Sequence, residues 1–294
     1  MLKAKEFEMA TFYNQATLSY GGNTLNSNTT EAELLSGLGL TKTAISSSYE
    51  ADGSIVYAIT LSNMSGTAYN ALTVTDNLGA YTLPDGTTTV VPLDYVNGSI
   101  LYYLNGVLQS APTVVSTGGL EISGINLPAN STATFIYETR ANEFAPIAAG
   151  STVVNTASVD GGTGVGVLTD TATVPVNEEP ELTIAKAVCP AVLTDNGQLT
   201  YTIIIQNLGN SPIIATDGVT VSDVFNPILS NITVTLNGTE LQAGTGYTYD
   251  ETTGAFATTD GTITVPAATY TQDPTTGAWG VTPGVATLTV TGTV

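Results

Sequence analysis

Apolar and polar residues alternate along almost the whole chain, in short runs separated by turn-forming residues. In residues 55–61, for example, large apolar side chains recur at every second position. Successive side chains of a strand point to opposite faces, so this period indicates strands with one buried face. Asp-Gly or Asn-Gly turn signals occur at Asp52-Gly53, Asn97-Gly98, Asn105-Gly106, Asn237-Gly238 and Asp260-Gly261. No segment has the period of an amphipathic helix, so the pattern predicts an all-β protein built as sandwiches of short antiparallel strands.

The same pattern occurs twice. Tyr57 follows Lys42 by fifteen positions, and Tyr201 follows Lys186 by fifteen positions. An asparagine follows each tyrosine six residues later, at Asn63 and Asn207. Matched spacing among unlike residue types indicates an internal repeat. The expected parts are an N-terminal segment (residues 1–33), domain 1 (residues 34–177) and domain 2 (residues 178–294).

Domain 2 is shorter than domain 1 at its carboxyl end. In domain 1, a strand at residues 133–137 is followed by a hairpin at residues 153–159 and 167–174. In domain 2, the matching strand at residues 286–290 is followed by four residues only. We therefore expect domain 2 to lack its last hairpin, which would expose core side chains and an unpaired edge.

The N-terminal segment contains a hairpin that matches the missing one. Its first strand alternates like the closing strand around Asn155, and residues 25–29 resemble the return strand at residues 168–172. A strand supplied by another chain can complete a sandwich of this kind. The predicted subunit-binding residues of this donor strand are Phe12, Asn14, Ala16, Leu18 and Tyr20.

The connector between this hairpin and domain 1 is short. Residues 30–40 span at most about 35 Å when fully extended, which is about the length of one sandwich domain. Completing domain 2 of the same chain would need a fully stretched connector, so donation to a neighbouring chain is favoured. Because donor and acceptor surfaces differ, the contact is heterologous and repeats into a ring or an open filament. Of these two, we expect the filament.

The repeated motifs resemble a known domain family. They are a Tyr-x-Ile-x-x-x-Asn strand, a strand that ends in Asp76 or Asp223, and a closing Asn-Thr-Ala strand. Over residues 38–294 they resemble the conserved-repeat domain of bacterial and archaeal surface proteins called domain of unknown function eleven. The resemblance implies two tandem immunoglobulin-like β-sandwich domains in a cell-surface or appendage protein. It implies no enzymatic activity.

Each domain places a lysine on the inward face of a strand. Lys42 and Lys186 alternate with leucine and isoleucine positions on the same strand face. Burying an unpaired ammonium group costs on the order of several kcal/mol, so the lysine must lose its proton or find a partner. The same period of two turns Asp76, Asp223 and Asn155 inward.

This combination offers the chemistry of a spontaneous isopeptide bond. A neutral lysine attacks an asparagine carboxamide, a protonated carboxyl group polarises the amide, and ammonia leaves. The arrangement resembles the self-crosslinking domains of Gram-positive pilins and collagen adhesins. The candidate groups are Lys42, Asp76 and Asn155 in domain 1, and Lys186, Asp223 and the Asn14 of a neighbouring chain in domain 2. A buried Lys–Asp ion pair, with the asparagine hydrogen-bonded to the backbone, is the alternative interpretation.

Composition restricts the partners. The chain has five basic and 25 acidic residues and a formal charge of −20, so we expect neither nucleic acid nor membrane insertion. It has no histidine and no residues with the spacing of a metal site, so no metal and no cofactor are expected.

No run approaches the roughly 20 apolar residues of a membrane-spanning helix, and the first ten residues lack a signal-peptide pattern. The sole cysteine, Cys189, can form a disulfide only with another chain.

We therefore predict a structural, non-enzymatic subunit of an extracellular filament at the cell or spore surface. Each subunit would donate its N-terminal strand to domain 2 of the next, with isopeptide bonds as a covalent lock. A signal peptide was either removed or never used, and in the second case assembly inside a sporulating mother cell would yield an appendage on the spore surface. The alternative is a cell-surface adhesin or surface-layer module that binds a glycan or a host protein. Its signature would be an exposed aromatic patch, drawn from Tyr102, Tyr103, Tyr270 or Trp279.

Overall fold

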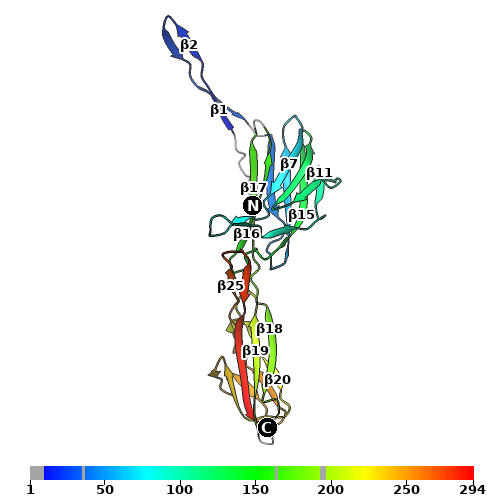
Figure 1. Ribbon diagram of the computed structural model, residues 1–294, viewed down its shortest axis with the longest axis vertical. Coiled ribbons are helices and arrows are strands. Elements are labelled where there is room, and N and C mark those ends of the chain that lie inside the picture. Colours follow the sequence, from blue (N-terminus) through cyan, green and yellow to red (C-terminus); the bar gives the residue numbers. More distant parts are fainter. Residues whose placement is uncertain (1–9, 35–36, 163–164, 193–196) are drawn as a thin grey trace. The chain divides into compact units, whose positions relative to one another are not determined.

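The fold is all-β. The computed structural model describes residues 10–34, 37–162, 165–192 and 197–294. Within these residues it contains β-strands and one short 3-10 helix, Ala215–Asp217. The chain forms two compact units (Figure 1), of which one comprises Met1–Ala145 and Thr152–Pro175, and the other Pro146–Ser151 and Val176–Val294. The first unit holds most of domain 1 and the second holds domain 2, and each is a β-sandwich. The predicted fold class is confirmed.

Domain 1 contains two antiparallel sheets. The six-stranded sheet has the order β12-β11-β15-β6-β5, with β10 also paired to β15. Its strands are β5 (Leu38–Ala44), β6 (Ser54–Asn63), β10 (Leu93–Tyr95), β11 (Leu101–Leu104), β12 (Val107–Leu108) and β15 (Ser131–Ala141). The five-stranded sheet has the order β13-β14-β7-β16-β17. Its strands are β7 (Tyr69–Asp76), β13 (Thr113–Ser116), β14 (Leu120–Leu127), β16 (Thr152–Asp160) and β17 (Val167–Pro175). A separate small hairpin pairs β8 (Tyr81–Thr82) with β9 (Thr89–Val90).

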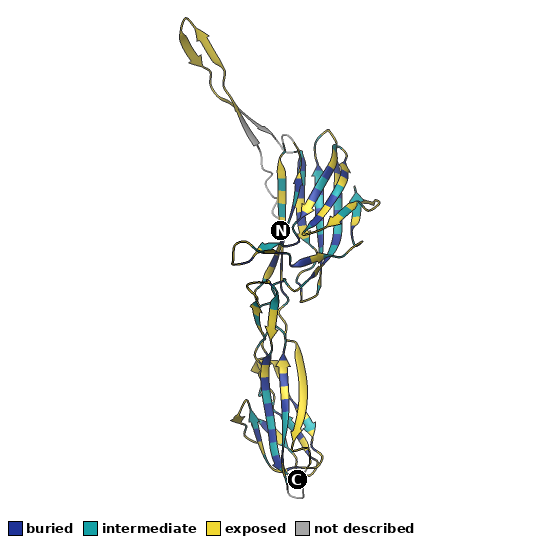
Figure 2. Ribbon diagram, viewed as in Figure 1, coloured by how far each residue is buried: buried dark blue, intermediate teal, exposed yellow. Residues whose placement is uncertain are grey.

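The core of domain 1 lies between the inner faces of these sheets. Every second residue of β6 and β15 is buried, so buried and less buried positions alternate along both strands (Figure 2). Tyr57 and Phe135 of the first sheet and Ile122 of the second are all fully buried. The period of two in the sequence therefore arises because one face of each sheet packs against the other sheet.

The N-terminal segment forms a hairpin in two parts. β1 (Ala10–Asn14) pairs with β4 (Thr30–Leu34), and β2 (Thr17–Tyr20) pairs with β3 (Asn23–Asn26). The side chains of residues 13–30 are all exposed. One expectation needs correction, because the first part of the presumed connector, residues 30–34, is itself a strand. Its backbone groups find their partners in β1, which sequence periodicity alone does not reveal.

Domain 2 also has two principal antiparallel sheets. The larger sheet has the order β18-β19-β27-β21-β22, and the smaller has the order β20-β24-β23. The larger comprises β18 (Leu182–Cys189), β19 (Gln198–Asn207), β21 (Ser230–Leu236), β22 (Thr239–Glu240) and β27 (Gly284–Thr293). The smaller comprises β20 (Ser222–Val224), β23 (Tyr247–Tyr249) and β24 (Ala255–Thr258), and a separate hairpin pairs β25 (Thr269–Gln272) with β26 (Trp279–Thr282).

The repeated asparagines have the same structural role in both domains. Each is buried at the end of its strand, and its amide donates to the backbone carbonyl four residues later. The distances are 2.8 Å from Asn63 to Thr67 and 2.7 Å from Asn207 to Ser211. A buried amide must be hydrogen-bonded to avoid a desolvation cost, so these residues fix the loop after the strand rather than mark a binding site.

Candidate functional site

The last hairpin of domain 1 joins its two sheets. β16 pairs with β7, which places Ala157 opposite Asp76. On its other side β16 pairs with β17, and β17 lies against β5. The Asp170 carboxylate of β17 accepts a hydrogen bond of 2.7 Å from the backbone N–H of Lys42 in β5. The hairpin therefore closes one side of the sandwich.

β18 of domain 2 has the alternating sequence of β5 but a different environment. Leu38, Leu40 and Lys42 of β5 are buried, whereas all eight residues of β18 are exposed. Ile184, which occupies the position of Leu40, is 65% exposed. Figure 2 shows this exposure along the whole of β18. The strand has the composition of a core strand, but nothing in the described part of the chain covers it.

The second sheet of domain 2 is open beside β20. Its counterpart in domain 1, β7, has β14 on one side and β16 on the other. β20 pairs with β24 on one side, and the described residues supply no strand on the other side. We call β18 and the free side of β20 the acceptor edge. It lies where domain 1 holds β16 and β17.

The N-terminal hairpin presents apolar side chains on one face. Leu18 of β2 lies opposite Leu25 of β3, and Leu18 is 61% exposed. Tyr20 follows Leu18 at the strand period and is also exposed. On the other face, the Thr17 hydroxyl donates to the side-chain oxygen of Asn26 at 3.0 Å. The hairpin is thus amphipathic although its apolar face is uncovered.

Three further binding residues predicted from the sequence lie on the same hairpin. Asn14 and Ala16 are exposed. The Asn14 carbonyl accepts a hydrogen bond of 3.2 Å from the Thr30 hydroxyl, so Asn14 is held near the junction of β1 and β4. The side chain of Phe12 lies outside the described residues.

A buried polar cluster surrounds Lys42 in domain 1. The Lys42 and Asp76 side chains form an ion pair and are both 0% exposed. Lys42 Nζ also donates to the Tyr137 hydroxyl at 2.6 Å, and that hydroxyl donates to Asp76 Oδ2. The Tyr57 ring centroid lies 4.6 Å from Nζ. The structure therefore brings two of the predicted groups, Lys42 and Asp76, into direct contact.

Asn155 lies beside this cluster and is fully buried. Its Oδ1 accepts a hydrogen bond of 3.2 Å from the backbone N–H of Gly79. The amide is near enough to the Tyr57 and Tyr137 hydroxyls to lower their pKa values, in opposition to the larger effect of burial. Even so, neither Asn155 Nδ2 nor the Tyr57 hydroxyl has a hydrogen bond of ordinary geometry. Leaving a buried amide without a good hydrogen bond costs roughly 1–3 kcal/mol.

Burial has opposite consequences for the lysine and the tyrosines of the cluster. It lowers the pKa of Lys42, although the charges of Asp76 and Asp170 oppose this shift. Burial raises the pKa values of Tyr57 and Tyr137, and the charge of Asp76 raises them further. Burial therefore makes Lys42 easier to deprotonate than a free lysine, and the neutral amine is the nucleophilic form.

Domain 2 contains the matching ion pair in an open environment. Lys186 contacts Asp223 Oδ2, but the two side chains are 40% and 21% exposed. Lys186 Nζ also lies 4.2 Å from the Tyr201 ring centroid. The sequence suggests an inward lysine in both domains. In the single chain Lys186 is exposed, because domain 2 has no described hairpin over β18.

Sequence reasoning did not identify Tyr137, Gly79 or Asp170. Tyr137 alternates with Phe135 on the inner face of β15, and that pattern is typical of an ordinary core aromatic residue. Its hydroxyl acquires a role only because β15, β5 and β7 place it between Lys42 and Asp76. Asp170 lies on an outer strand, where an acidic residue is unremarkable in the sequence.

The remaining predictions concern metals, the cysteine and aromatic residues. Among the described residues, no cluster of three potential metal ligands occurs and no helix is long and apolar enough to cross a membrane. Cys189 is exposed at the end of β18. The four aromatic residues considered for an adhesive patch are all half-buried: Tyr102, Tyr103, Tyr270 and Trp279.

Comparisons with known proteins show only weak similarity. No family model matches the chain, and no curated protein matches it. Among solved structures, the major pilin subunit BcpA of Bacillus cereus aligns at 12% identity and a TM-score of 0.34, over 93% of this chain and 73% of that chain. The major pilin SpaD of Corynebacterium diphtheriae aligns at 10% identity and a TM-score of 0.35, over 84% of this chain and 59% of that chain.

An enzyme is also among the similar structures. AvmM, which catalyses macrocyclization in alchivemycin A biosynthesis, aligns at 13% identity and a TM-score of 0.29, over 56% of this chain and 97% of that chain. The chain spans less than two thirds of the length of SpaD. Similarities at these TM-scores assign no function, and the resemblance to domain of unknown function eleven stays a prediction.

Proposed function

We propose that the chain is a structural subunit of an extracellular filament, in which the N-terminal hairpin of one copy completes domain 2 of the next. One observation carries the proposal: β18 has the sequence pattern of the buried strand β5 but is exposed throughout. The N-terminal hairpin is a suitable partner for β18, because its apolar face is also exposed. Exposed apolar surface on both elements favours their association.

The ladder in domain 1 predicts the register between copies. There, Ala157, Ser158 and Val159 of β16 pair with Asp76, Thr75 and Val74 of β7. If Asn14 takes the place of Asn155, the matching pairs between chains are Ala16 with Asp223, Thr17 with Ser222, and Leu18 with Val221. Leu18 would then enter the core of domain 2. Burying a side chain of this size contributes roughly 1.5–3 kcal/mol.

Covalent bonds would lock the filament. In domain 1 the bond would join Lys42 to Asn155 within one chain, and in domain 2 it would join Lys186 to the Asn14 of the neighbour. The Lys42–Asp76 contact, the lowered pKa of Lys42 and the unpartnered Asn155 Nδ2 support the first bond. A permanent ion pair remains the alternative. We place the filament at the cell or spore surface, where its subunits would bind one another rather than a nucleic acid or a membrane.

Deleting residues 1–30 tests the proposal. The full chain should form filaments that are visible by electron microscopy, and the shortened chain should stay monomeric with domain 1 folded. Adding a peptide of residues 10–34 to the shortened chain should raise the melting temperature of domain 2, because a ligand that binds only the folded state stabilises it.

The shortened chain also serves as a control in mixtures. Its domain 2 accepts a donor but it offers none, so it should shorten filaments of the full chain when the two are mixed. Filaments that still form from the shortened chain, or a full chain that stays monomeric at high concentration, would contradict strand donation.

A further inference from the structure

The Tyr137 hydroxyl occupies a special position in the domain 1 cluster. It accepts a hydrogen bond from Lys42 Nζ at 2.6 Å and donates one to Asp76 Oδ2, the same oxygen that Lys42 Nζ contacts directly. The neighbouring Tyr57 ring packs against it, with ring centroids 5.9 Å apart. The Tyr57 hydroxyl, by contrast, lies near the Asn155 amide but has no hydrogen bond of ordinary geometry and does not bridge Lys42 and Asp76. Two buried tyrosines thus share one site, and only one has its hydroxyl between the base and the acid.

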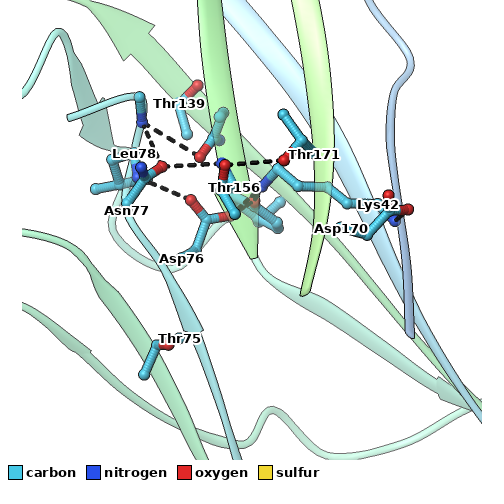
Figure 3. Close-up of polar contacts among 12 residues, drawn as sticks. Lys42, Thr75, Asp76, Asn77, Leu78, Thr139, Thr156, Asp170 and Thr171 are labelled. Atoms are coloured by element: carbon cyan, nitrogen blue, oxygen red, sulfur yellow. Dashed lines mark hydrogen bonds and ion pairs between the residues drawn. The ribbon is translucent and has the colours of Figure 1, made fainter. Parts of the chain in front are cut away.

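A second group in the same site is aimed at the amide. After β7 the chain turns through Leu78 and Gly79, with φ angles of 51° and 75°. This left-handed turn directs the Leu78 N–H at Asp76 Oδ1 (2.8 Å), while the Gly79 N–H is shared between Asn77 Oδ1 (3.0 Å) and Asn155 Oδ1 (3.2 Å). Figure 3 shows Asp76, Asn77 and Leu78 together at this turn. A backbone N–H on the oxygen of an amide stabilises the negative charge that develops there when the amide carbon is attacked.

We propose that Tyr137 is a catalytic residue for an intramolecular Lys42–Asn155 amide bond, in which it relays the lysine proton to Asp76 as the amine turns from its direct contact with that carboxylate towards the amide. The inference rests on the proposed cross-link and adds the groups that bring it about. Lys42 passes one proton to the Tyr137 oxygen while the tyrosine passes its own proton to Asp76, which leaves a neutral amine and a neutral carboxyl group. The Gly79 N–H holds the Asn155 oxygen during the attack.

The bond changes balance without any further reactant. A bond forms between Lys42 Nζ and Asn155 Cγ, and the bond between Cγ and Nδ2 breaks. Nδ2 takes a second proton from the attacking amine and leaves as ammonia. The products are the amide, ammonia and a protonated Asp76, which together carry the zero net charge of the starting ion pair and carboxamide.

Domain 2 lacks this machinery although it keeps the lysine and the aspartate. Tyr137 lies opposite Tyr57 in the β6–β15 ladder, and Val290 lies opposite Tyr201 in the matching β19–β27 ladder. The turn also differs, because the Phe225 N–H that follows β20 is bonded to the Gly254 carbonyl. We therefore expect the bond in domain 1 to form faster than any bond at Lys186.

The two tyrosines provide a matched experiment. The full chain, Tyr137→Phe and Tyr57→Phe are made by cell-free synthesis, stopped in denaturant at set times, and analysed by intact mass and by mapping of cross-linked peptides. Proton transfer by a positioned side chain contributes roughly 10²–10⁴-fold to a rate. Tyr137→Phe should slow the loss of ammonia from the Lys42–Asn155 pair by about 100-fold or more. Tyr57→Phe should leave the rate within a few-fold of that of the unmodified chain.

The outcomes separate the two proposals. If the unmodified chain loses no ammonia, the cross-link itself is wrong. If it does and the two variants cross-link equally fast, the cross-link stands and the role of Tyr137 is overturned. Should Tyr137→Phe fail to fold, a fluorinated tyrosine at position 137 keeps the ring and the hydroxyl but makes the hydroxyl more acidic. An unchanged rate with that residue would also overturn the relay.

Discussion

β5 and β18 are corresponding strands of the two domains, but β5 is largely buried and β18 is exposed. Both alternate apolar residues with small or polar ones around a central lysine. β5 is buried at Leu38, Leu40 and Lys42, while β18 is exposed at every residue. The difference lies in the hairpin β16–β17, which closes domain 1 and has no described counterpart in domain 2.

An alternating apolar pattern makes one face of a strand suited to burial, but the residues on that face are buried only where another strand packs against them. In domain 1 the partner strand belongs to the same chain: Asp170, 128 residues after Lys42 in the sequence, accepts the Lys42 N–H, and Ala157 lies opposite Asp76. In domain 2 no described strand covers the corresponding face of β18. The amphipathic N-terminal hairpin has the alternating pattern of a strand that could cover it.

The largest expected effect comes from supplying domain 2 with a hairpin of its own. Residues 10–34 are attached through a flexible linker after Val294, in a chain from which residues 1–30 have been removed. The product should be a monomer that forms no filaments, because its own hairpin occupies the acceptor edge at high effective concentration. Size-exclusion chromatography and thermal unfolding measure the two effects. An unchanged melting temperature of domain 2 would show that the hairpin does not bind there.

A single charge on the apolar face of the hairpin should prevent assembly almost as completely. Leu18→Asp would bring an unpaired carboxylate into the core of domain 2, at a cost on the order of several kcal/mol. We expect filament formation to require at least about 100-fold more protein, measured by sedimentation.

The adjacent position provides the control for this variant. Ser19 corresponds to Asp160 of β16, which is exposed in domain 1. Ser19→Asp should therefore polymerise like the unmodified chain. Equal behaviour of the two variants would mean that the predicted facing of the strand is wrong.

A smaller effect is expected where β17 meets β5. Asp170→Ala removes the carboxylate that accepts the Lys42 N–H, which should lower the unfolding free energy of domain 1 by about 1–3 kcal/mol. Asp94→Ala, at an exposed position of β10, is the control and should change it by less than about 0.5 kcal/mol. Urea unfolding measures both, in an Asn155→Ala background that cannot cross-link. A loss no larger than that of the control would argue against the hydrogen bond.

The smallest effect is a pH dependence in the same Asn155→Ala background. Because burial lowers the pKa of Lys42 below its ordinary value of 10.5, the folded domain binds fewer protons than the unfolded chain between these two values. The unfolding free energy should therefore rise with pH in this window. Measurements are kept below about pH 9, since the raised pKa values of Tyr57 and Tyr137 act in the opposite direction near the ordinary tyrosine pKa. Lys42→Met should remove this rise of the unfolding free energy with pH. An equal slope in both proteins would show that Lys42 is not its source.

Much of the fold could be predicted from local pattern. The period of two placed strands such as β6 and β15, and Asp-Gly and Asn-Gly pairs marked turns, because both signals depend on neighbouring residues only. The extent of the N-terminal hairpin could not be predicted fully. β4 forms because residues 30–34 pair with residues 10–14, and such pairing depends on where the chain folds back.

The cluster around Lys42 shows the same division. Alternation was enough to turn Lys42, Asp76 and Asn155 to one side of their strands, since that depends on the geometry of a single strand. Packing decided which of them meet, placed the Tyr137 hydroxyl between two of them, and directed the Gly79 N–H at the third. It also left Lys186 exposed. Which face a residue takes is a property of one strand, whereas burial and hydrogen bonding require a second strand to arrive, and residues distant in the sequence supply that strand.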